Sequence, residues 1–369
     1  MRKKELAGPR RTMERSGAVF GTAAASTAKL TDVAQAAGVS LATASRALSA
    51  PDQVRAPTRE RVLAAANKLG YLAHGAARAL ASQRTRTIGA IFPPVENPVF
   101  ATGTHALSQT LSKAGYTLLL ATHDYSVDEE LLAARHLMER GVDGLVLVGL
   151  QHDSALLPLL DKVGMPYELT WSADAAEQYF SVGIDHTDAS AAMTRYLLAL
   201  GHRQFAVIAG QVERNDRAAA RLLGVRATLA AAGVALADHQ IVQSPFSLTA
   251  GRQATAQLLD SAGPFTAIIA GNDLLAVGAV LECQSRGIAV PEQITVVGFD
   301  DIELAGQMSP GITTIRVPSA DIGRLAGQRL LERLAGQPVP RCEQLQFELI
   351  ERDTAAAPPT GRRAAARRA

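Results

Sequence analysis

The sequence is poor in cysteine and in aromatic residues, and both scarcities limit what the protein can be. Only Cys283 and Cys342 occur among its 369 residues, so the chain can build neither a disulfide framework nor a cysteine-rich zinc site. Such sparing use of cysteine is typical of proteins that work in a reducing compartment. Aromatic residues make up 4% of the chain, and this low share, with abundant alanine, favours closely packed helices.

Long apolar runs, a secretion signal and catalytic motifs are also missing. No stretch approaches the ~20 apolar residues that span a bilayer, and Gly8 and Pro9 interrupt any apolar region behind the basic start of the chain. The sequence contains no GxSxG, GxxxxGK[ST], HExxH or GxGxxG motif. We therefore expect a protein of the cytoplasm that is no enzyme and uses no cofactor or metal.

The charge of the chain is divided unevenly between its two parts. Residues 1–87 contain fifteen Lys and Arg against five Asp and Glu, a net charge of +10. Because the whole chain carries +2, residues 88–369 must carry −8. A basic head on an acidic body suits binding to DNA, since the head neutralises phosphates and the body limits non-specific attachment.

Residues 30–48, LTDVAQAAGVSLATASRAL, have the pattern of a helix-turn-helix. We expect Thr31 to cap a first helix, Gly38 to end it in a left-handed conformation and Ser40 to cap a second helix. The small residues Ala34 and Ala44 allow the two helices to cross closely. An ordinary helical hairpin is the alternative, and the basic charge of this region favours the helix-turn-helix.

The rest of the chain divides by its periodicity. Residues 1–28 form a basic arm and 354–369 a tail without periodicity, and we expect both to be disordered. A helix over 58–69 completes a three-helix DNA-binding domain at 29–73, followed by a hinge linker at 74–87. Short apolar strands alternate with helices over 88–353 in two successive series, which predicts two Rossmann-like subdomains with a ligand cleft at the carboxyl ends of their parallel strands.

Several motifs together resemble the LacI family of bacterial transcription regulators over residues 29–350. They are TDVAQAAGVSLATASRAL, TRERVLAAANKLGY, RTRTIGAIFP, LGHRQFAVIAG, GNDLLAVGAV, VPEQITVVGFDD and PGITTIRVP. The body looks most similar to the gluconate-repressor-like branch. The resemblance implies an all-α helix-turn-helix head on a periplasmic-binding-protein-like α/β body.

The resemblance also implies how such a chain assembles and works. It implies a homodimer that binds a pseudo-palindromic operator in double-stranded DNA and responds to a small effector. The absence of a leucine heptad near the C-terminus favours a dimer over a tetramer. The chain would cross between the subdomains three times, with residues 88–170 and 295–315 in the first subdomain and the remainder in the second.

The resemblance assigns DNA contacts to the second helix of the head. Leu41, Ala42 and Arg46 match the base-reading positions, and Arg46 suits a bidentate contact to guanine, with a phosphate contact as the alternative. Leu41 and Ala42 offer apolar contact, for example to thymine methyl groups. Four hydroxyl residues suit phosphate contacts: Thr31, Ser40, Thr43 and Ser45.

In the hinge, Leu80 matches the apolar wedge that enters the minor groove, and Ala81 follows it. Ordinary packing of Leu80 is the alternative. His74, Gly75 and Arg55 depart from the family pattern, and Gly75 weakens a hinge helix by about 1 kcal/mol relative to alanine.

The resemblance places one half of an effector site on two segments of the second subdomain. Asp273 matches the family's ligand-binding aspartate beside Asn272, although it could equally cap the following helix. Arg221 matches the ligand-binding arginine, and Arg217, which follows Asp216, is a rival because this loop is one residue longer than in some relatives. Two guanidinium groups favour an effector with a carboxylate or phosphate, such as a sugar acid, and surface ion pairing with Asp216 or Glu213 is the alternative.

The first subdomain would supply the other half of the site. Asn97, Val99 and Phe100 match positions that close over the ligand, and Phe100 could stack on a sugar or pack in the core. Trp171 could line the cleft or pack the hinge between the subdomains. Two other classes remain, a solute-binding protein of a transporter and a sugar-processing α/β enzyme. The first requires a secretion signal, the second a catalytic motif, and neither uses a DNA-binding head.

Overall fold

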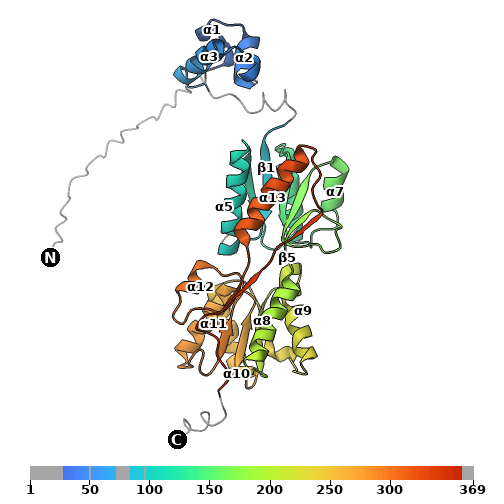
Figure 1. Ribbon diagram of the computed structural model, residues 1–369, viewed down its shortest axis with the longest axis vertical. Helices are drawn as coiled ribbons and strands as arrows, with labels where there is room; N and C mark the ends of the chain where they lie inside the picture. The colour runs from blue at the N-terminus through green and yellow to red at the C-terminus, as the bar shows by residue number, and fades with distance from the viewer. Residues whose placement is uncertain (1–27, 50, 72–83, 95–96, 360–369) are drawn as a thin grey trace, which may run out of the picture. The chain divides into compact units, whose positions relative to one another are not determined.

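The computed structural model describes residues 28–49, 51–71, 84–94 and 97–359, shown in colour in Figure 1. The chain forms two compact units, Met1–Gln83 and Arg84–Ala369. We call them the head and the body and describe each separately. Leu80 and Ala81, the predicted wedge of the hinge, lie outside the described residues.

The head is a bundle of three short helices around a core of small residues. Its elements are α1 (Leu30–Ala37), α2 (Leu41–Ser49), the 3₁₀ turn η1 (Pro51–Gln53) and α3 (Ala56–Lys68). Val33, Ala34, Ala44 and Val62 are buried between them. Because the alanines are small, the helices approach closely, as the sequence predicted.

The helix ends of the head explain the turn between α1 and α2. Gly38 ends α1 with φ 63°, which confirms the predicted left-handed position. The hydroxyl of Ser40 caps α2 by accepting the backbone N–H of Thr43 at 3.2 Å. The predicted cap at Thr31 is wrong: the helix begins at Leu30, and the Asp32 carboxylate accepts the N–H of the preceding Lys29 at 2.8 Å.

The first subdomain of the body is a six-stranded parallel sheet covered by helices on both faces (Figure 1). Its strands stand in the order β11-β5-β4-β3-β1-β2. They are β1 (Thr87–Phe92), β2 (Thr117–Thr122), β3 (Gly144–Val148), β4 (Tyr167–Ser172), β5 (Ser181–Ile184) and β11 (Cys342–Gln344). The covering helices are α5 (Pro98–Lys113) and α13 (Ser319–Leu334) on one face, with α6 (Val127–Glu139) and α7 (Leu156–Val163) on the other.

The second subdomain repeats this plan around four parallel strands in the order β7-β6-β8-β9. They are β6 (Phe205–Gly210), β7 (Ile241–Ser244), β8 (Ala267–Ala270) and β9 (Thr295–Val297). Helices α8 (His186–Ala199) and α9 (Asp216–Ala231) cover one face, and α10 (Leu248–Ser261) and α11 (Asp273–Ser285) the other. The short elements η2 (Asp238–Gln240), α12 (Glu303–Gln307) and the antiparallel pair β10 (Thr314–Arg316) and β12 (Glu348–Ile350) complete it.

Three segments connect the two subdomains: the one from β5 to α8, the one from β10 to α13, and the one from β11 to β12. The predicted assignment of segments is wrong at three points. β5, predicted in the second subdomain, pairs with β4 in the first sheet. α13 and β11 were also predicted in the second subdomain, but β11 pairs with β5 and α13 packs on α5 in the first. β9, predicted in the first subdomain, pairs with β8 in the second. Alternating strands and helices predict parallel sheets, but the apolar pattern of a strand does not say which sheet it joins.

The predicted disordered tail begins too early at residue 354. Thr354 is fully buried, and its backbone N–H donates to the carbonyl of Gly311 at 3.0 Å. Its own carbonyl accepts from the N–H of Val296 at 3.0 Å. Residues 354–359 are therefore packed against the second subdomain, although their composition is that of a loop. Among the described residues, no helix is long and apolar enough to cross a bilayer.

Helices α5 and α13 approach so closely that their contact depends on glycine. A Cβ added at Gly323 of α13 would lie 1.9 Å from the carbonyl oxygen of Gly103 in α5. We expect Gly323→Ala to lower the free energy of unfolding by about 1–3 kcal/mol, because the helices must separate. Urea denaturation measures this change. Gly306→Ala is the control, since a Cβ at Gly306 would lie no closer than 3.5 Å to a neighbour; equal stability of the two variants would contradict the packing.

Candidate functional site

Helix α2 presents an exposed face suited to contact with DNA. Leu41 is 50% exposed, although it is a large apolar residue. Ala42, Ser45 and Arg46 are exposed beside it, and Ala44 on the opposite side is buried. Arg46 forms no ion pair with any described residue. The helix therefore offers apolar atoms and a free guanidinium to a base edge.

The hydroxyl residues of the head differ in their availability. Thr31 and Ser45 are exposed, as phosphate contacts require. The Ser40 hydroxyl lies 2.9 Å from that of half-buried Thr43, so these two side chains also hold the start of α2. Their contact with phosphates stays a prediction.

In the body, the carboxyl ends of both parallel sheets bring together five polar residues. We call Asn97, Tyr125, Arg217, Arg221 and Asp300 the inter-subdomain cluster. Asn97 and Tyr125 come from loops of the first subdomain, after β1 and β2, and the others come from the second. The charges of both arginines act on Asp300 within the second subdomain, and the Asp300 carboxylate accepts a hydrogen bond from the Asn97 amide of the first.

Arg217 lies in the first turn of α9, where Asn215 caps the helix. Its Nη1 donates to Oδ1 of Asp216 at 2.9 Å, and Oδ2 of Asp216 accepts from the hydroxyl of Ser172 in the first subdomain at 2.6 Å. Gly149, also of the first subdomain, has φ 92° and packs against this pair, since a Cβ there would lie 2.1 Å from Nη1 of Arg217. The ion pair with Asp216 thus exists, but it is enclosed between the subdomains instead of lying on the surface.

Arg221 is a half-buried cation that forms no ion pair with a described carboxylate, although the charge of Asp300 acts on it. Its guanidinium carbon lies 4.8 Å from the centre of the Phe299 ring, and its Nη1 lies 3.4 Å from Nδ1 of His186. Its Nε is buried and has no hydrogen-bond partner in the described part of the chain. Burial lowers the pKa of Arg221, whereas the charge of Asp300 raises it, and a guanidinium stays charged in proteins. A buried donor without an acceptor is costly, so this position favours a ligand that brings an anionic group.

Asp300 is the carboxylate that faces the two arginines, and the sequence analysis did not name it. It follows β9 with φ 112° and is buried. Burial raises the pKa of Asp300 to about 7, against the lowering effects of Arg221, the Asn97 hydrogen bond and Arg217. The motif VVGFDD carried the signal that could have found it, because an acidic residue directly after a parallel strand lies at the ligand edge of the sheet.

Asp273 is bonded within the protein, and its contact with a ligand stays a prediction. Its Oδ1 accepts from the Thr314 hydroxyl at 2.6 Å and its Oδ2 from the N–H of Ile302 at 2.8 Å. With both oxygens bonded and the side chain fully buried, this carboxylate fastens the β9–β10 region to α11. Asn272, and not Asp273, caps α11 by accepting the N–H of Leu275. The Nδ2 of Asn272 is buried without a partner among the residues that the structure describes, and its contact with a ligand stays a prediction.

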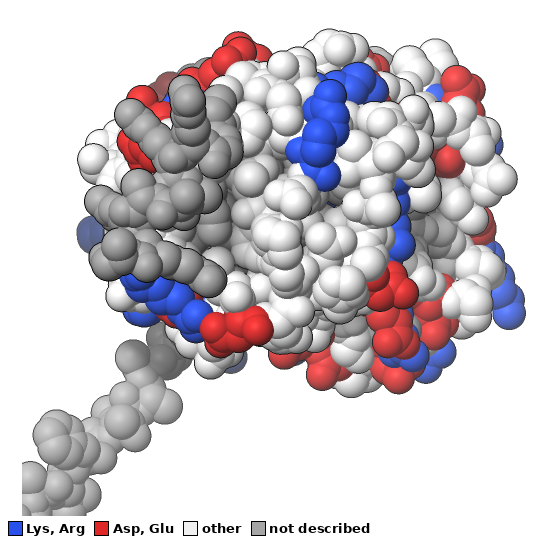
Figure 2. All heavy atoms as spheres, turned by 90° about the horizontal axis from the view of Figure 1, so that it is seen from below, with Lys and Arg blue, Asp and Glu red and all other residues white. Residues whose placement is uncertain are grey.

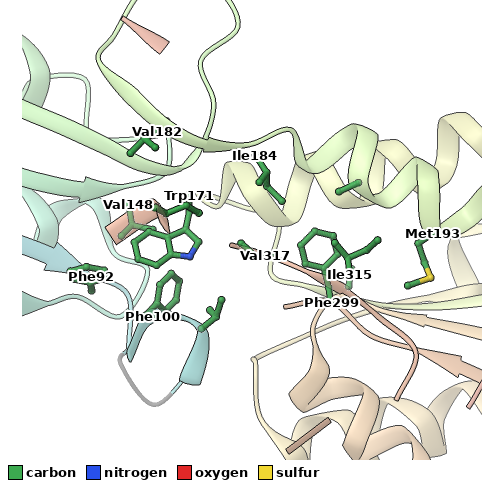
Figure 3. Packing of buried hydrophobic residues seen from close by; sticks show 14 of the residues in the cluster. Phe92, Phe100, Val148, Trp171, Val182, Ile184, Met193, Phe299, Ile315 and Val317 are labelled. Atoms are coloured by element: carbon green, nitrogen blue, oxygen red, sulfur yellow. The ribbon is translucent and has the colours of Figure 1, made fainter. Parts of the chain in front are cut away.

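The residues predicted around β1 and β4 lie against one another. Val99 and Phe100 are core residues of α5, and the ring centres of Phe100 and Trp171 lie 5.1 Å apart. In Figure 3, Trp171 rests on Phe92 and Phe100, and Phe299 lies on the far side of Ile184 and Val317. Direct ligand contact by Val99 and Phe100 stays a prediction; the observed role of Phe100 is to support Trp171.

Trp171 combines a strained backbone with an unused donor. It has φ 66°, which is uncommon for a bulky residue. Its indole nitrogen is buried and has no hydrogen-bond partner among the described residues. Of the two roles predicted for Trp171, packing at the junction is observed, and lining the ligand site is compatible with the unpaired nitrogen.

Aromatic residues that the sequence analysis missed close the opposite side of the cluster. Tyr125 of the first subdomain and Phe246 of the second have ring centres 6.1 Å apart. Burial raises the pKa of Tyr125, while Arg217 and Arg221 lower it. Next to Tyr125, both ring nitrogens of His123 are buried without a partner. Single aromatic residues in a loop give no periodic signal, so the sequence alone could not select them.

A small cavity of about 20 Å³ lies within the second subdomain and borders Arg221, Phe299, Gly210 and Gly271, room for about one water molecule. No group of three or more potential metal ligands occurs in the described part of the chain.

The raised pKa of Asp300 predicts a pH dependence of stability. A carboxyl whose folded pKa is about 7 binds its proton more tightly in the folded protein than in the unfolded chain, where the ordinary value is about 4. The contribution of Asp300 to the free energy of unfolding is therefore favourable at pH 5 and is lost as the pH rises through 7. Glu168, whose pKa burial also raises to about 7, acts in the same direction.

We expect Asp300→Asn to flatten the decrease in stability between pH 5 and pH 8. Asparagine tolerates the positive φ of this position, so the backbone should persist. The measurement is the urea midpoint of both proteins across this range. Parallel pH profiles would contradict the raised pKa of Asp300.

Head and body together define a class of protein, a helix-turn-helix joined to a two-subdomain body of the periplasmic-binding type. Residues 29–73 match the family model described as bacterial regulatory proteins, lacI family, and residues 194–355 match a periplasmic binding protein-like domain. The regulator GntR of Pseudomonas aeruginosa is 34% identical over 327 residues, 88% of this chain and 95% of the relative. The repressor CytR of Escherichia coli is 33% identical over 336 residues, which cover 90% of this chain and 97% of the relative.

Solved structures agree with these sequence relatives. One solved structure is a lac repressor dimer bound to operator and the anti-inducer ONPF. The match covers 90% of this chain and 100% of the repressor chain, at 28% identity and a TM-score of 0.79. The match to a CelR–cellobiose complex covers 89% of this chain and 100% of the CelR chain, at 30% identity and a TM-score of 0.67. The chain belongs to the LacI family and is a DNA-binding transcriptional regulator.

Proposed function

We propose that the protein is a homodimeric repressor of carbohydrate or sugar-acid use, whose affinity for a pseudo-palindromic operator is set by a small effector in the inter-subdomain cluster. The observation that carries this proposal is Arg221, a half-buried residue whose Nε is buried and has no hydrogen-bond partner among the described residues. It lies where both sheets end, the place where ligands bind in this architecture. An anionic, hydroxyl-rich ligand would supply the missing hydrogen-bond acceptor.

The polar groups around Arg221 support a sugar acid over a neutral sugar. Arg217 is already paired with Asp216, so one guanidinium of the two remains for the ligand anion. Asp300 and the Nδ2 of Asn272 provide an acceptor and a donor for hydroxyl groups. CelR, by contrast, is known in complex with the neutral disaccharide cellobiose. The ligand class therefore follows from the charge of this site, and not from the family.

A ligand that touches both subdomains favours one relative orientation of them. It can change DNA affinity only by its differential affinity for the two orientations. Release of the operator by an inducer is the direction we propose, and a co-repressor would obey the same linkage with opposite sign. Regulation of this kind places the protein in the cytoplasm, on the nucleoid.

The experiment is calorimetric titration of the full-length protein with D-gluconate, D-glucuronate and D-glucose. We expect the two acids to bind and glucose to bind at least tenfold more weakly. Equal affinity for acid and neutral sugar would contradict an anionic ligand. Turnover of any of these compounds would favour a sugar-processing enzyme.

The hinge gives a second prediction. Leu80→Ala should weaken binding to the operator far more than binding to unrelated DNA, because an apolar wedge acts only where a base step is unstacked. Fluorescence anisotropy measures both affinities, and gel mobility of circularly permuted fragments measures DNA bending. Unchanged operator affinity together with unchanged bending would contradict the wedge.

A further inference from the structure

His186 is a buried histidine whose two ring nitrogens contact one group of each subdomain. It is the first residue of α8, directly after the chain crosses from β5 into the second subdomain. Its Nε2 lies 3.0 Å from the carbonyl oxygen of Trp171 in the first subdomain. Its Nδ1 lies 3.4 Å from Nη1 of Arg221, and its ring stacks on Phe299 at a centre distance of 5.6 Å and an interplanar angle of 26°.

The partners of His186 determine which nitrogen carries the proton. A carbonyl oxygen only accepts and a guanidinium only donates. Nε2 must therefore bear the hydrogen that Trp171 receives, and Nδ1 must present the lone pair that Arg221 uses. The neutral form is also favoured because burial, with Arg221 and Arg217 nearby, lowers the pKa of His186 well below its usual value.

This arrangement connects the buried cation to the strained residue at the end of β4. Phe299 lies under both the His186 ring and the Arg221 guanidinium, so the three groups form one packed unit. The same imidazole bonds the main chain of Trp171, whose φ is 66°. Among the described residues, His186 is the hydrogen-bond partner that fixes the direction of the Arg221 guanidinium.

We propose that His186 is a positioning residue, which as the neutral Nε2–H tautomer aims Arg221 at the ligand and links it to the first subdomain through the Trp171 carbonyl. This inference rests on the proposed function, because it assigns Arg221 to the ligand. It concerns a residue that the sequence analysis did not select. It also predicts that the two ring nitrogens of His186 affect ligand affinity separately.

Two isosteric substitutions separate the two bonds. In His186→Asn, the side-chain oxygen takes the place of Nδ1 and keeps the acceptor for Arg221, but the donor to Trp171 is lost. In His186→Gln, the side-chain nitrogen takes the place of Nε2 and keeps the donor to Trp171, but the acceptor for Arg221 is lost. His202→Asn is the matched control, since His202 is a buried histidine bonded to Thr266 and to the carbonyl of Ala356, away from the cluster.

We expect calorimetric titration with D-gluconate to give an affinity for His186→Asn within about threefold of wild type. His186→Gln should bind at least tenfold more weakly. The thermal midpoints without ligand should fall by similar amounts in both, so a merely structural role would not produce this split. His202→Asn should lower the midpoint and leave the gluconate affinity unchanged. Equal affinities of the two His186 variants would overturn the proposal.

A second measurement needs no ligand. Long-range ¹H–¹⁵N spectra of histidine-labelled protein, assigned with His186→Asn, report the tautomer of His186. We expect the neutral Nε2–H form from pH 6 to pH 8; an Nδ1–H or doubly protonated ring would overturn the proposal. If wild type failed to bind gluconate while the tautomer was as expected, the ligand class of the proposed function would be wrong and the arrangement around His186 would stand.

Discussion

Arg221→Met should abolish sugar-acid binding, weakening it by at least 100-fold, and leave operator DNA bound whether or not the ligand is present. Truncating one partner of a buried charge pair costs about 2–5 kcal/mol, and here the ligand is the other partner. Methionine fills a similar volume between Phe299 and Phe246, and Arg221 forms no ion pair with a described residue, so the fold should persist.

The measurements for Arg221→Met are gluconate titration and operator anisotropy with and without gluconate. Arg226→Met is the control on the same helix, because Arg226 is exposed and pairs with Asp238 at the surface. It should bind gluconate like wild type. Undiminished gluconate binding by Arg221→Met would show that the ligand binds outside the inter-subdomain cluster.

Arg46→Ala should weaken operator binding by about 1–3 kcal/mol and relax the base preference at one position of each half-site. The reason is the exposed guanidinium on the face of α2 that also carries Leu41 and Ala42. Binding to unrelated DNA should change little beyond the loss of one charge.

Arg61→Ala is the matched control for Arg46. It removes the same charge from an exposed position of α3, so any effect should be uniform across sequences and decrease with salt. Competition between operator variants at several salt concentrations separates the two effects. Equal loss on every sequence in Arg46→Ala would identify Arg46 as a phosphate contact.

The fold was predictable from sequence where local patterns determine structure. Gly38 and Ser40 specify the turn of the head, and alternating strands and helices specify two parallel sheets. The partner of each strand was not predictable, because β5 and β9 are short apolar runs that fit either sheet. The packed stretch after Thr354 was missed for the same reason, since its order comes from contacts distant in sequence.

The candidate site was predictable in part. Arg217, Arg221 and Asn97 lie together as expected, since each follows a strand or begins a helix at the ligand edge. Asp273 and Asp300 both follow strands, and only the three-dimensional contacts show which carboxylate is already bonded within the protein. Tyr125 lies in a loop and His186 begins α8, and no motif in the sequence marks either residue, so their roles follow from contacts alone.

The charges of the body agree with DNA binding through the head. Figure 2 looks onto the second subdomain, and acidic and basic groups are intermingled on this face. No continuous basic stripe is visible among the described residues there. Phosphate contacts should therefore come from the head region, because residues 1–87 carry a net charge of +10 and residues 88–369 a net charge of −8.

The most direct test of the account is the affinity of the full-length protein for a pseudo-palindromic duplex selected from random DNA, compared with a scrambled duplex of equal composition, with and without gluconate. The account predicts at least 1,000-fold tighter binding to the selected duplex, as is typical of specific regulators. It also predicts that gluconate changes this affinity and leaves that for the scrambled duplex unchanged. Equal affinity for both duplexes, unaffected by gluconate, would contradict it.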